Sequence, residues 1–300
     1  MRCGEAPRAA CGPAVAVTHA VPHCPHRNCA PLPTSVAAEG LHLHCRRALA
    51  QGLAPAAALA AAYLATDAEA RGCARFCMPR PNALFLAKAE VALPPPALAP
   101  APRAQVAAAG IAECCGCTAV TAHVSRGAGG VRISVANAGD ARAVLVRLPV
   151  APGAPLLAEA LSVDHVPSSP AEAARIAAVG GVVARGRVLG VLAVSRALGD
   201  VCLKPSVTPQ PHIADVALPP GQRAALLLFC DGVSGVCTDG DVAATVAAAL
   251  AACAHARAQA WDGTREGGGD ADAAAAAEAL VAEAMRRGTR DNVTVLAVLL

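Results

Sequence analysis

Residues 224–230 read AALLLFC, and they are followed directly by Asp231 and Gly232. An unbroken apolar run of this length, ended by a turn signal, is typical of a central β-strand buried on both faces. The carboxylate of Asp231 is then delivered to the rim of the sheet. A charged group in that position is costly unless it binds a cation or accepts several hydrogen bonds. The stretch therefore predicts a core strand with a polar site at its end.

Two further aspartates lie where strands are expected to begin or end. Asp291 directly precedes the apolar run 293–300, and Asp140 occupies the sequence NAGDAR over residues 137–142, a tight turn between two predicted strands. Several carboxylates on one rim suit hard divalent cations, which prefer oxygen ligands. The alternative interpretation is that each aspartate caps a turn or a helix with its side chain. Spacing alone leaves both interpretations open.

The surrounding pattern predicts an α+β protein. Short β-branched segments separated by Gly and Asn indicate an antiparallel meander at residues 118–124, 131–136 and 141–148. Helical patterns occur in pairs, within residues 36–70 and again at 241–254 and 272–287. A further helix is expected to open at Ser169, with Pro170 in its first turn and Glu172 completing a capping box.

Composition excludes several classes of protein. The chain has 300 residues, of which 16% are charged, and its formal net charge of +3 argues against disorder and against nucleic acid as the main partner. Only five residues are aromatic, so the core must be aliphatic. We expect no membrane span and no secretory signal, whereas the acid-poor, Arg-bearing start leaves a transit peptide open.

Residues 1–35 are rich in Pro, Cys and His and are predicted to form an irregular leader. The alternative is a zinc site between His19 and Cys29, although the spacing fits no two-pair zinc pattern. The remaining cysteines, of 14 in total, are interpreted as free thiols, because disulfide scaffolds belong to short secreted chains. Residues 92–103 are expected to form a proline-rich loop.

A set of motifs in a fixed order carries a resemblance to a known family. They are NAGDARAVL at 137–145, LSVDHVP at 161–167, RVLGVLAVSRALGD at 187–200, DGVSGV at 231–236 and RDNVTV at 290–295. This set resembles the metal-dependent serine/threonine protein phosphatases of the PPM (type 2C) family. The likeness is strongest over residues 116–300 and extends weakly back to residue 36, so residues 36–300 are expected to form one phosphatase domain.

The resemblance implies an αββα sandwich, in which two antiparallel β-sheets are flanked by helix pairs. It also implies two Mg²⁺ or Mn²⁺ ions and a metal-activated water that attacks phosphoserine or phosphothreonine. By the same resemblance Asp231 and Asp291 match metal ligands, and Asp140 matches a ligand of a weaker third metal. The expected partner is a phosphorylated protein, and no nucleic acid or membrane. The chain is expected to be an intracellular monomer of the cytoplasm or nucleus, with a plastid location left open.

The sequence also departs from the family pattern. The Asp-Gly-His-Gly-Gly segment that supplies a bridging carboxylate is absent, and the positions ahead of Ala37 read APLPT at residues 30–34. The N-terminal strands are expected to be incomplete, which would expose a sheet edge unless residues 1–35 cover it. A rival hypothesis is therefore a catalytically inactive phosphatase-like binding or regulatory module. Mis-assigned first exons would also explain the leader.

Four other predictions concern particular residues or pairs of residues. Asp231 and Asp291 should converge to within about 8 Å, close enough to serve one or two cations. His165 is interpreted as structural, and the alternative is a general acid. Arg196 and Asp200 are expected to form a buried pair or a loop brace, and the alternative is that they touch metal-bound water. Lys204 is expected to be a solvated or sheet-edge lysine.

Overall fold

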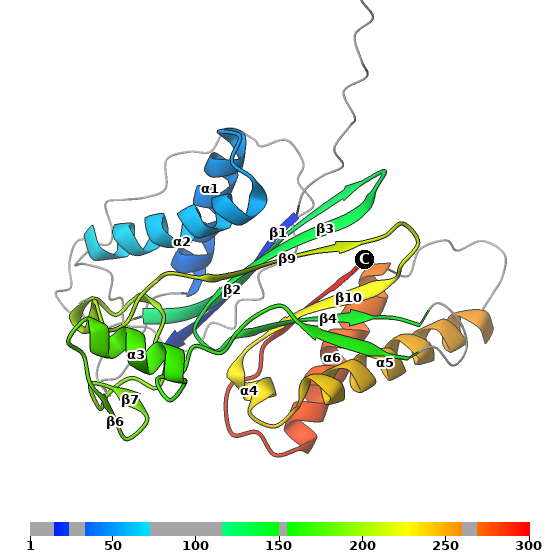
Figure 1. Ribbon diagram of the computed structural model, residues 1–300. Helices are drawn as coiled ribbons and strands as arrows, with labels where there is room; N and C mark the ends of the chain where they lie inside the picture. The colour runs from blue at the N-terminus through cyan, green and yellow to red at the C-terminus, as the bar shows by residue number, and fades with distance from the viewer. Residues whose placement is uncertain (1–14, 24–33, 73–115, 150–154, 260–268) are drawn as a thin grey trace, which may run out of the picture.

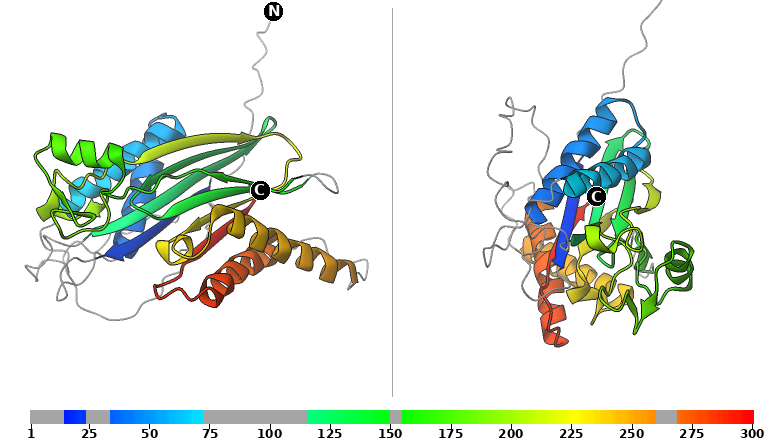
Figure 2. Two further views of the ribbon diagram at one scale, coloured as in Figure 1. Left: turned by 60° about the horizontal axis from the view of Figure 1, so that its bottom comes forward. Right: turned by 90° about the vertical axis from the view of Figure 1, so that its left-hand side faces the viewer.

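The computed structural model describes residues 15–23, 34–72, 116–149, 155–259 and 269–300, and the chain folds into four layers (Figure 1). Two antiparallel sheets lie face to face, and a pair of helices covers the outer face of each (Figure 2). The predicted αββα sandwich is confirmed. The predicted proline-rich loop at residues 92–103 lies outside the described residues.

The first sheet has the order β1-β2-β3-β9. Its strands are β1 (Val15–His23), β2 (Gly116–Gly127), β3 (Gly130–Ala138) and β9 (His212–Leu218). A short strand, β8 (Leu198–Gly199), pairs with the beginning of β2.

The second sheet has the order β11-β10-β4-β5. Its strands are β4 (Arg142–Arg147), β5 (Leu157–Ala160), β10 (Ala224–Phe229) and β11 (Val295–Leu299). The predicted central strand is β10, which pairs with β4 on one side and with β11 on the other.

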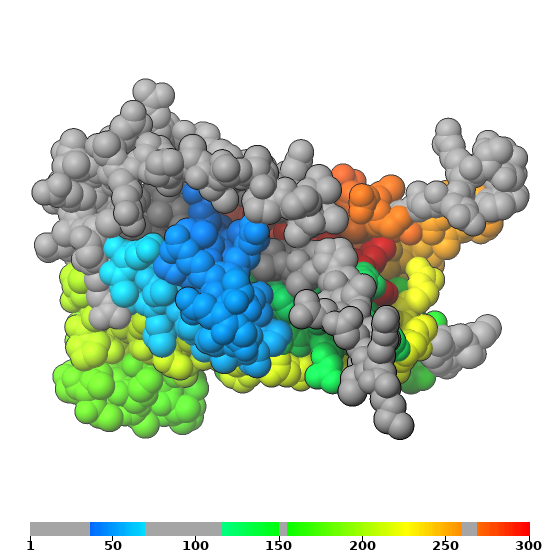
Figure 3. Space-filling view, turned by 90° about the horizontal axis from the view of Figure 1, so that it is seen from above, coloured from blue at the N-terminus to red at the C-terminus, as the bar shows by residue number. Residues whose placement is uncertain are grey.

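The helices form two outer layers. α1 (Thr34–Ala50) and α2 (Pro55–Gly72) lie over the first sheet and are packed side by side in the space-filling view (Figure 3). α5 (Asp239–Gln259) and α6 (Gly269–Arg286) cover the second sheet. Where α1 and α2 pack, a Cβ atom at Gly40 would lie 3.1 Å from Thr66 Cγ2, so glycine permits their close approach.

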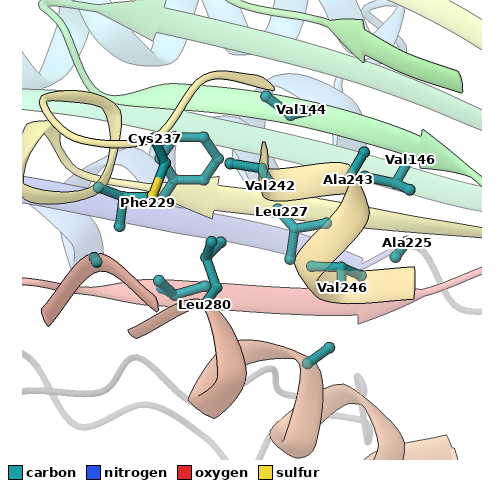
Figure 4. Packing of buried hydrophobic residues seen from close by; sticks show 14 of the residues in the cluster. Val144, Val146, Ala225, Leu227, Phe229, Cys237, Val242, Ala243, Val246 and Leu280 are labelled. Atoms are coloured by element: carbon teal, nitrogen blue, oxygen red, sulfur yellow. The ribbon is translucent and has the colours of Figure 1, made fainter. Parts of the chain in front are cut away.

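Strand β10 shows how the apolar run fills two cores at once. Side chains on a strand alternate between its two faces. Leu227 and Phe229 pack against α5 and α6 (Figure 4), whereas Leu226 and Leu228 enter the core between the two sheets. All four side chains have an exposed fraction of 0%, which accounts for a strand with no polar alternation.

The remaining elements lie beside the sandwich. α3 (Pro170–Ala178) is followed by a two-stranded hairpin of β6 (Val183–Ala184) and β7 (Arg187–Val188). A 3₁₀ turn spans Val201–Leu203, and α4 (Asp231–Ser234) directly follows β10.

The prediction that residues 1–35 are irregular is wrong for β1, and α1 begins before residue 36. β1 pairs with β2 over nine positions, from Val15 opposite Val124 to His23 opposite Gly116. Local composition hid this strand because Pro22 argues against a strand. Proline is tolerated at a sheet edge, and β1 is the edge strand of its sheet. Residues 15–23 thus cover the edge of β2.

Two further findings concern composition. None of the described helices is long and apolar enough to cross a membrane. Six described cysteines are free thiols, among them Cys117 and Cys230. Both are buried.

Candidate metal-binding site

Asp231 and Asp291 lie at the same end of the second sheet. The pairing of β10 with β11 continues past Phe229, because the Cys230 N–H donates to the Thr294 carbonyl at 3.3 Å. The Cys230 thiol donates to the Asn292 carbonyl at 3.1 Å. The segments that carry the two aspartates are therefore in direct contact.

Gly232 makes this contact tight. A Cβ atom at this position would lie 2.1 Å from the Asn292 carbonyl oxygen, so a larger residue would push the two segments apart. In the sequence, the Asp-Gly pair at Asp231 and Gly232 indicates this close contact between the two segments.

Asp140 lies at the same rim, just before β4, which is the second strand that pairs with β10. Arg142 is paired with Phe229, and Asp140 lies two residues before Arg142, just as Asp231 lies two residues after Phe229. In an antiparallel pair the start of one strand lies beside the end of the other, so Asp140 and Asp231 lie at the same end of the two strands. The register of β10 thus gathers the three predicted ligand positions at one rim.

The carboxylates at this rim are the type of ligand that a hard cation prefers, but they are too few to complete its coordination shell. Asp140 and Asp231 are half-buried and Asp291 is exposed. Carboxylate oxygens are the donors that Mg²⁺ and Mn²⁺ prefer. Within the ranges that the structure describes, however, no three His, Cys, Asp or Glu side chains form a group that could hold a metal. The described residues therefore supply only part of a coordination shell.

The turn that carries Asp140 is held by a strap of three residues, Val163, Asp164 and His165. Asn137 Nδ2 donates to the Val163 carbonyl at 2.7 Å, and the Val163 N–H donates to Asn137 Oδ1 at 3.3 Å. Asp164 accepts two hydrogen bonds from Arg142, at 2.8 Å and 2.6 Å. Such bidentate pairs fix direction as well as distance.

His165 completes the strap and is a neutral, buried residue. Its exposed fraction is 2%, and its ring lies against Gly139. Burial and the nearby positive charge of Arg196 lower the pKa of His165 to about 4. The interpretation of His165 as structural agrees with this environment.

Glu172 organises the loop that follows α3, and it does not complete a capping box. Its carboxylate accepts hydrogen bonds from Arg175, Arg196 and Ser195, the last at 2.7 Å. The Ser169 side chain makes no capping hydrogen bond. Burial disfavours the charged form of Glu172, but these donors outweigh it and hold its pKa at about 2.

Arg196 therefore braces its loop with a different partner from the one predicted. It pairs with Glu172 at 2.6 Å and also donates to the Gln210 carbonyl at 2.9 Å, which corrects the expected pairing with Asp200. Asp200 is buried with φ +49° and lies against Gly116, where a Cβ atom would be 2.1 Å from its carboxylate. A glycine at the start of β2 makes room for this carboxylate.

Lys204 is half-buried and bonded to two partners, so the prediction that it is solvated is wrong. Its side chain is 11% exposed, and Nζ lies 3.0 Å from Asp67 Oδ1 and donates to the Ala197 carbonyl at 3.0 Å. Asp67 on α2 also accepts the Gly199 N–H at 2.9 Å. One buried carboxylate thus ties α2 to the loop at residues 197–204. A pairing between Asp67 and Lys204, so distant in sequence, leaves no local pattern.

Comparison with known proteins identifies the fold and the family. The family model described as Protein phosphatase 2C matches residues 89–293. The chain belongs to this family. Protein phosphatase 2C 56 of Arabidopsis thaliana is 41% identical over 175 residues, which cover 55% of this chain and 38% of that protein. The integrin-linked kinase-associated serine/threonine phosphatase 2C of Homo sapiens is 40% identical over 167 residues, covering 55% of this chain and 40% of that protein.

The solved structures agree on the fold. A serine-threonine phosphatase 2C from Toxoplasma gondii superimposes with a TM-score of 0.55 at 16% identity, covering 97% of this chain and 96% of that one. A sex determining protein of C. elegans gives a TM-score of 0.61 at 20% identity, covering 95% of this chain and 56% of that one. By contrast, the chain spans only 38% to 40% of the lengths of the two phosphatase 2C sequences above.

Proposed function

We propose that this chain is a metal-dependent protein phosphatase that hydrolyses phosphoserine and phosphothreonine in protein substrates, with Mg²⁺ or Mn²⁺ as the metal. The observation that carries the proposal is the common rim of Asp140, Asp231 and Asp291, set by the register of β10 with its two neighbours. Membership of the protein phosphatase 2C family supports the same reaction.

In this proposal Asp231 and Asp291 hold the principal metal and Asp140 contributes to a weaker one. When bound, divalent cations lower the pKa of a water molecule and neutralise charge on the phosphate. The protein supplies the oxygen ligands and holds them in place through Cys230, Gly232 and the 163–165 strap.

Cysteine chemistry does not fit this rim. Cys230 is the cysteine next to Asp231, and burial raises the pKa of its thiol. A nucleophilic cysteine needs the opposite shift, since the thiolate is the reactive form. A mechanism through a phosphocysteine is therefore disfavoured at this site.

The test is phosphate release from a phosphothreonine peptide by the full chain, with Mn²⁺ or Mg²⁺ and with a chelator. We expect release that depends on the metal, and Asp231→Asn or Asp291→Asn should lower it by about 100-fold or more, since even the outer partners of metal ligands are worth 10- to 100-fold. Asp270→Asn is the matched control, because Asp270 is an exposed aspartate in the first turn of α6.

Two results would contradict the proposal. One is release that persists in chelator, and the other is an equal loss in Asp231→Asn and Asp270→Asn. A folded chain that binds phosphopeptide without releasing phosphate at any Mn²⁺ concentration would support the binding-module hypothesis instead.

A further inference from the structure

His165 joins the turn that carries Asp140 to the loop that carries Ser195. Its N–H donates to the Gly139 carbonyl at 3.0 Å, and its own carbonyl accepts the Ser195 N–H at 2.8 Å. The ring nitrogen Nδ1 lies 3.2 Å from the Gly139 nitrogen, whose N–H points at it. Both backbone polar groups of Gly139 are thus bonded to this one residue.

The geometry fixes the role of the imidazole. A backbone N–H can only donate, so Nδ1 accepts from Gly139 and the ring proton lies on Nε2. Nδ1 is also 3.1 Å from the Gly139 carbonyl, but both lone pairs of that oxygen are already engaged, one by the His165 N–H at 3.0 Å and one by Asn137 Nδ2 at 3.3 Å. A proton on Nδ1 would oppose the Gly139 N–H. The ring is therefore a hydrogen-bond acceptor.

Gly139 has no side chain with which to hold its own conformation. Its φ is +108°, and a Cβ atom there would lie 2.2 Å from Thr118 Cγ2. Such a conformation is readily available only to glycine, which is also the most flexible residue when unfolded. The turn must be held from outside, and Asp140 is the next residue along the chain.

We propose that His165 is a positioning residue: its Nδ1 fixes Gly139 and thereby sets the direction in which the Asp140 carboxylate enters the rim. This inference rests on the proposed function for the consequence at the metal, but not for the contact itself. His165 is 98% buried by residue, with an exposed fraction of 2%, so it does not act by touching substrate.

The experiment compares three variants of the full chain. In His165→Asn the amide oxygen takes the position of Nδ1, so the acceptor is retained. In His165→Gln the oxygen lies one bond further out, and in His165→Leu a side chain of similar bulk has no acceptor. The first readout is hydrogen exchange of the Gly139 amide without added metal, which reports local opening of this turn.

We expect Gly139 exchange in His165→Asn to match the unmodified chain. Exchange should rise about tenfold in His165→Leu and His165→Gln, the equivalent of one net hydrogen bond. The second readout is the Mn²⁺ concentration for half-maximal phosphate release. This Mn²⁺ concentration should rise about 10-fold in His165→Leu. Losing a residue that orients a metal ligand typically costs about 10- to 100-fold in metal affinity or activity, and the expected rise is at the lower end of that range. His165→Asn should restore it.

The proposal is overturned if Gly139 exchange is equal in all variants, or if His165→Gln protects the amide as well as His165→Asn does. If His165→Leu does not fold, the comparison of Asn with Gln decides the question. If the unmodified chain releases no phosphate, the proposed function fails. The exchange data then still decide the contact, and Mn²⁺ binding followed by electron paramagnetic resonance replaces the second readout. Equal binding by all variants would overturn the link to Asp140.

Discussion

The two helical layers are attached to their sheets by different forces. α5 and α6 bury aliphatic side chains such as Val242, Val246 and Leu280 against the second sheet (Figure 4). α2 adds buried polar contacts: Tyr63 donates to the Ala136 carbonyl at 2.8 Å, and Asp67 binds the loop at residues 197–204. Apolar burial has no preferred direction, whereas hydrogen bonds do. The layer that reaches the loop bearing Asp200 is thus placed by buried directional bonds, whereas Asp239 of α5 meets Arg142 of the second sheet in a half-buried pair at 3.3 Å.

The largest effect should come from the buried carboxylate of α2. Asp67→Ala removes the partner of Lys204 and the acceptor of the Gly199 N–H, so we expect a loss of about 3–5 kcal/mol in the free energy of unfolding. Urea unfolding measures it. The double variant Asp67→Ala, Lys204→Met should recover part of this loss, because no buried charge is left behind. A single-variant cost below about 1 kcal/mol, the range of an exposed pair, would show that the contact does not hold the layer.

Truncation in the apolar layer should cost slightly less and act differently. Leu280→Ala should lower the free energy of unfolding by about 3 kcal/mol through lost burial and a residual cavity. Hydrogen exchange at residues 197–204 should exceed that of the unmodified chain only through global unfolding, whereas Asp67→Ala should open this loop locally. Equal local opening in both variants would erase the distinction between the two layers.

The smallest effect should come from a single hydroxyl. Tyr63→Phe removes the donor to the Ala136 carbonyl and a 3.2 Å contact with Thr121, so we expect a loss of about 1 kcal/mol in the free energy of unfolding. Thr121→Val alone should cost less, because Tyr63 keeps its bond to the carbonyl. A larger loss from Thr121→Val than from Tyr63→Phe would assign the anchor to the threonine.

Most of the fold could be predicted because its signals are local. The apolar run 224–230 is long enough to identify a strand buried on both faces, and the Asp-Gly pair marks its end. The turn at 137–142 and the helix from Pro170 follow from Gly, Asn and Pro, whose backbone preferences act within a few residues. β1 was missed, since its stability comes from pairing with β2, about a hundred residues away along the chain.

The same distinction between local signals and long-range contacts applies to the candidate site. The carboxylates at strand ends could be recognised in the sequence, because the residues next to a strand end set where the strand stops. The partners, by contrast, depend on how the chain packs: Glu172 for Arg196, Asp67 for Lys204, and His165 for Gly139. These bonds form between segments that the sheets bring together, and a charged or polar side chain buried there takes whichever partner the packing offers. The order of charged residues along the chain therefore does not predict which partners pair.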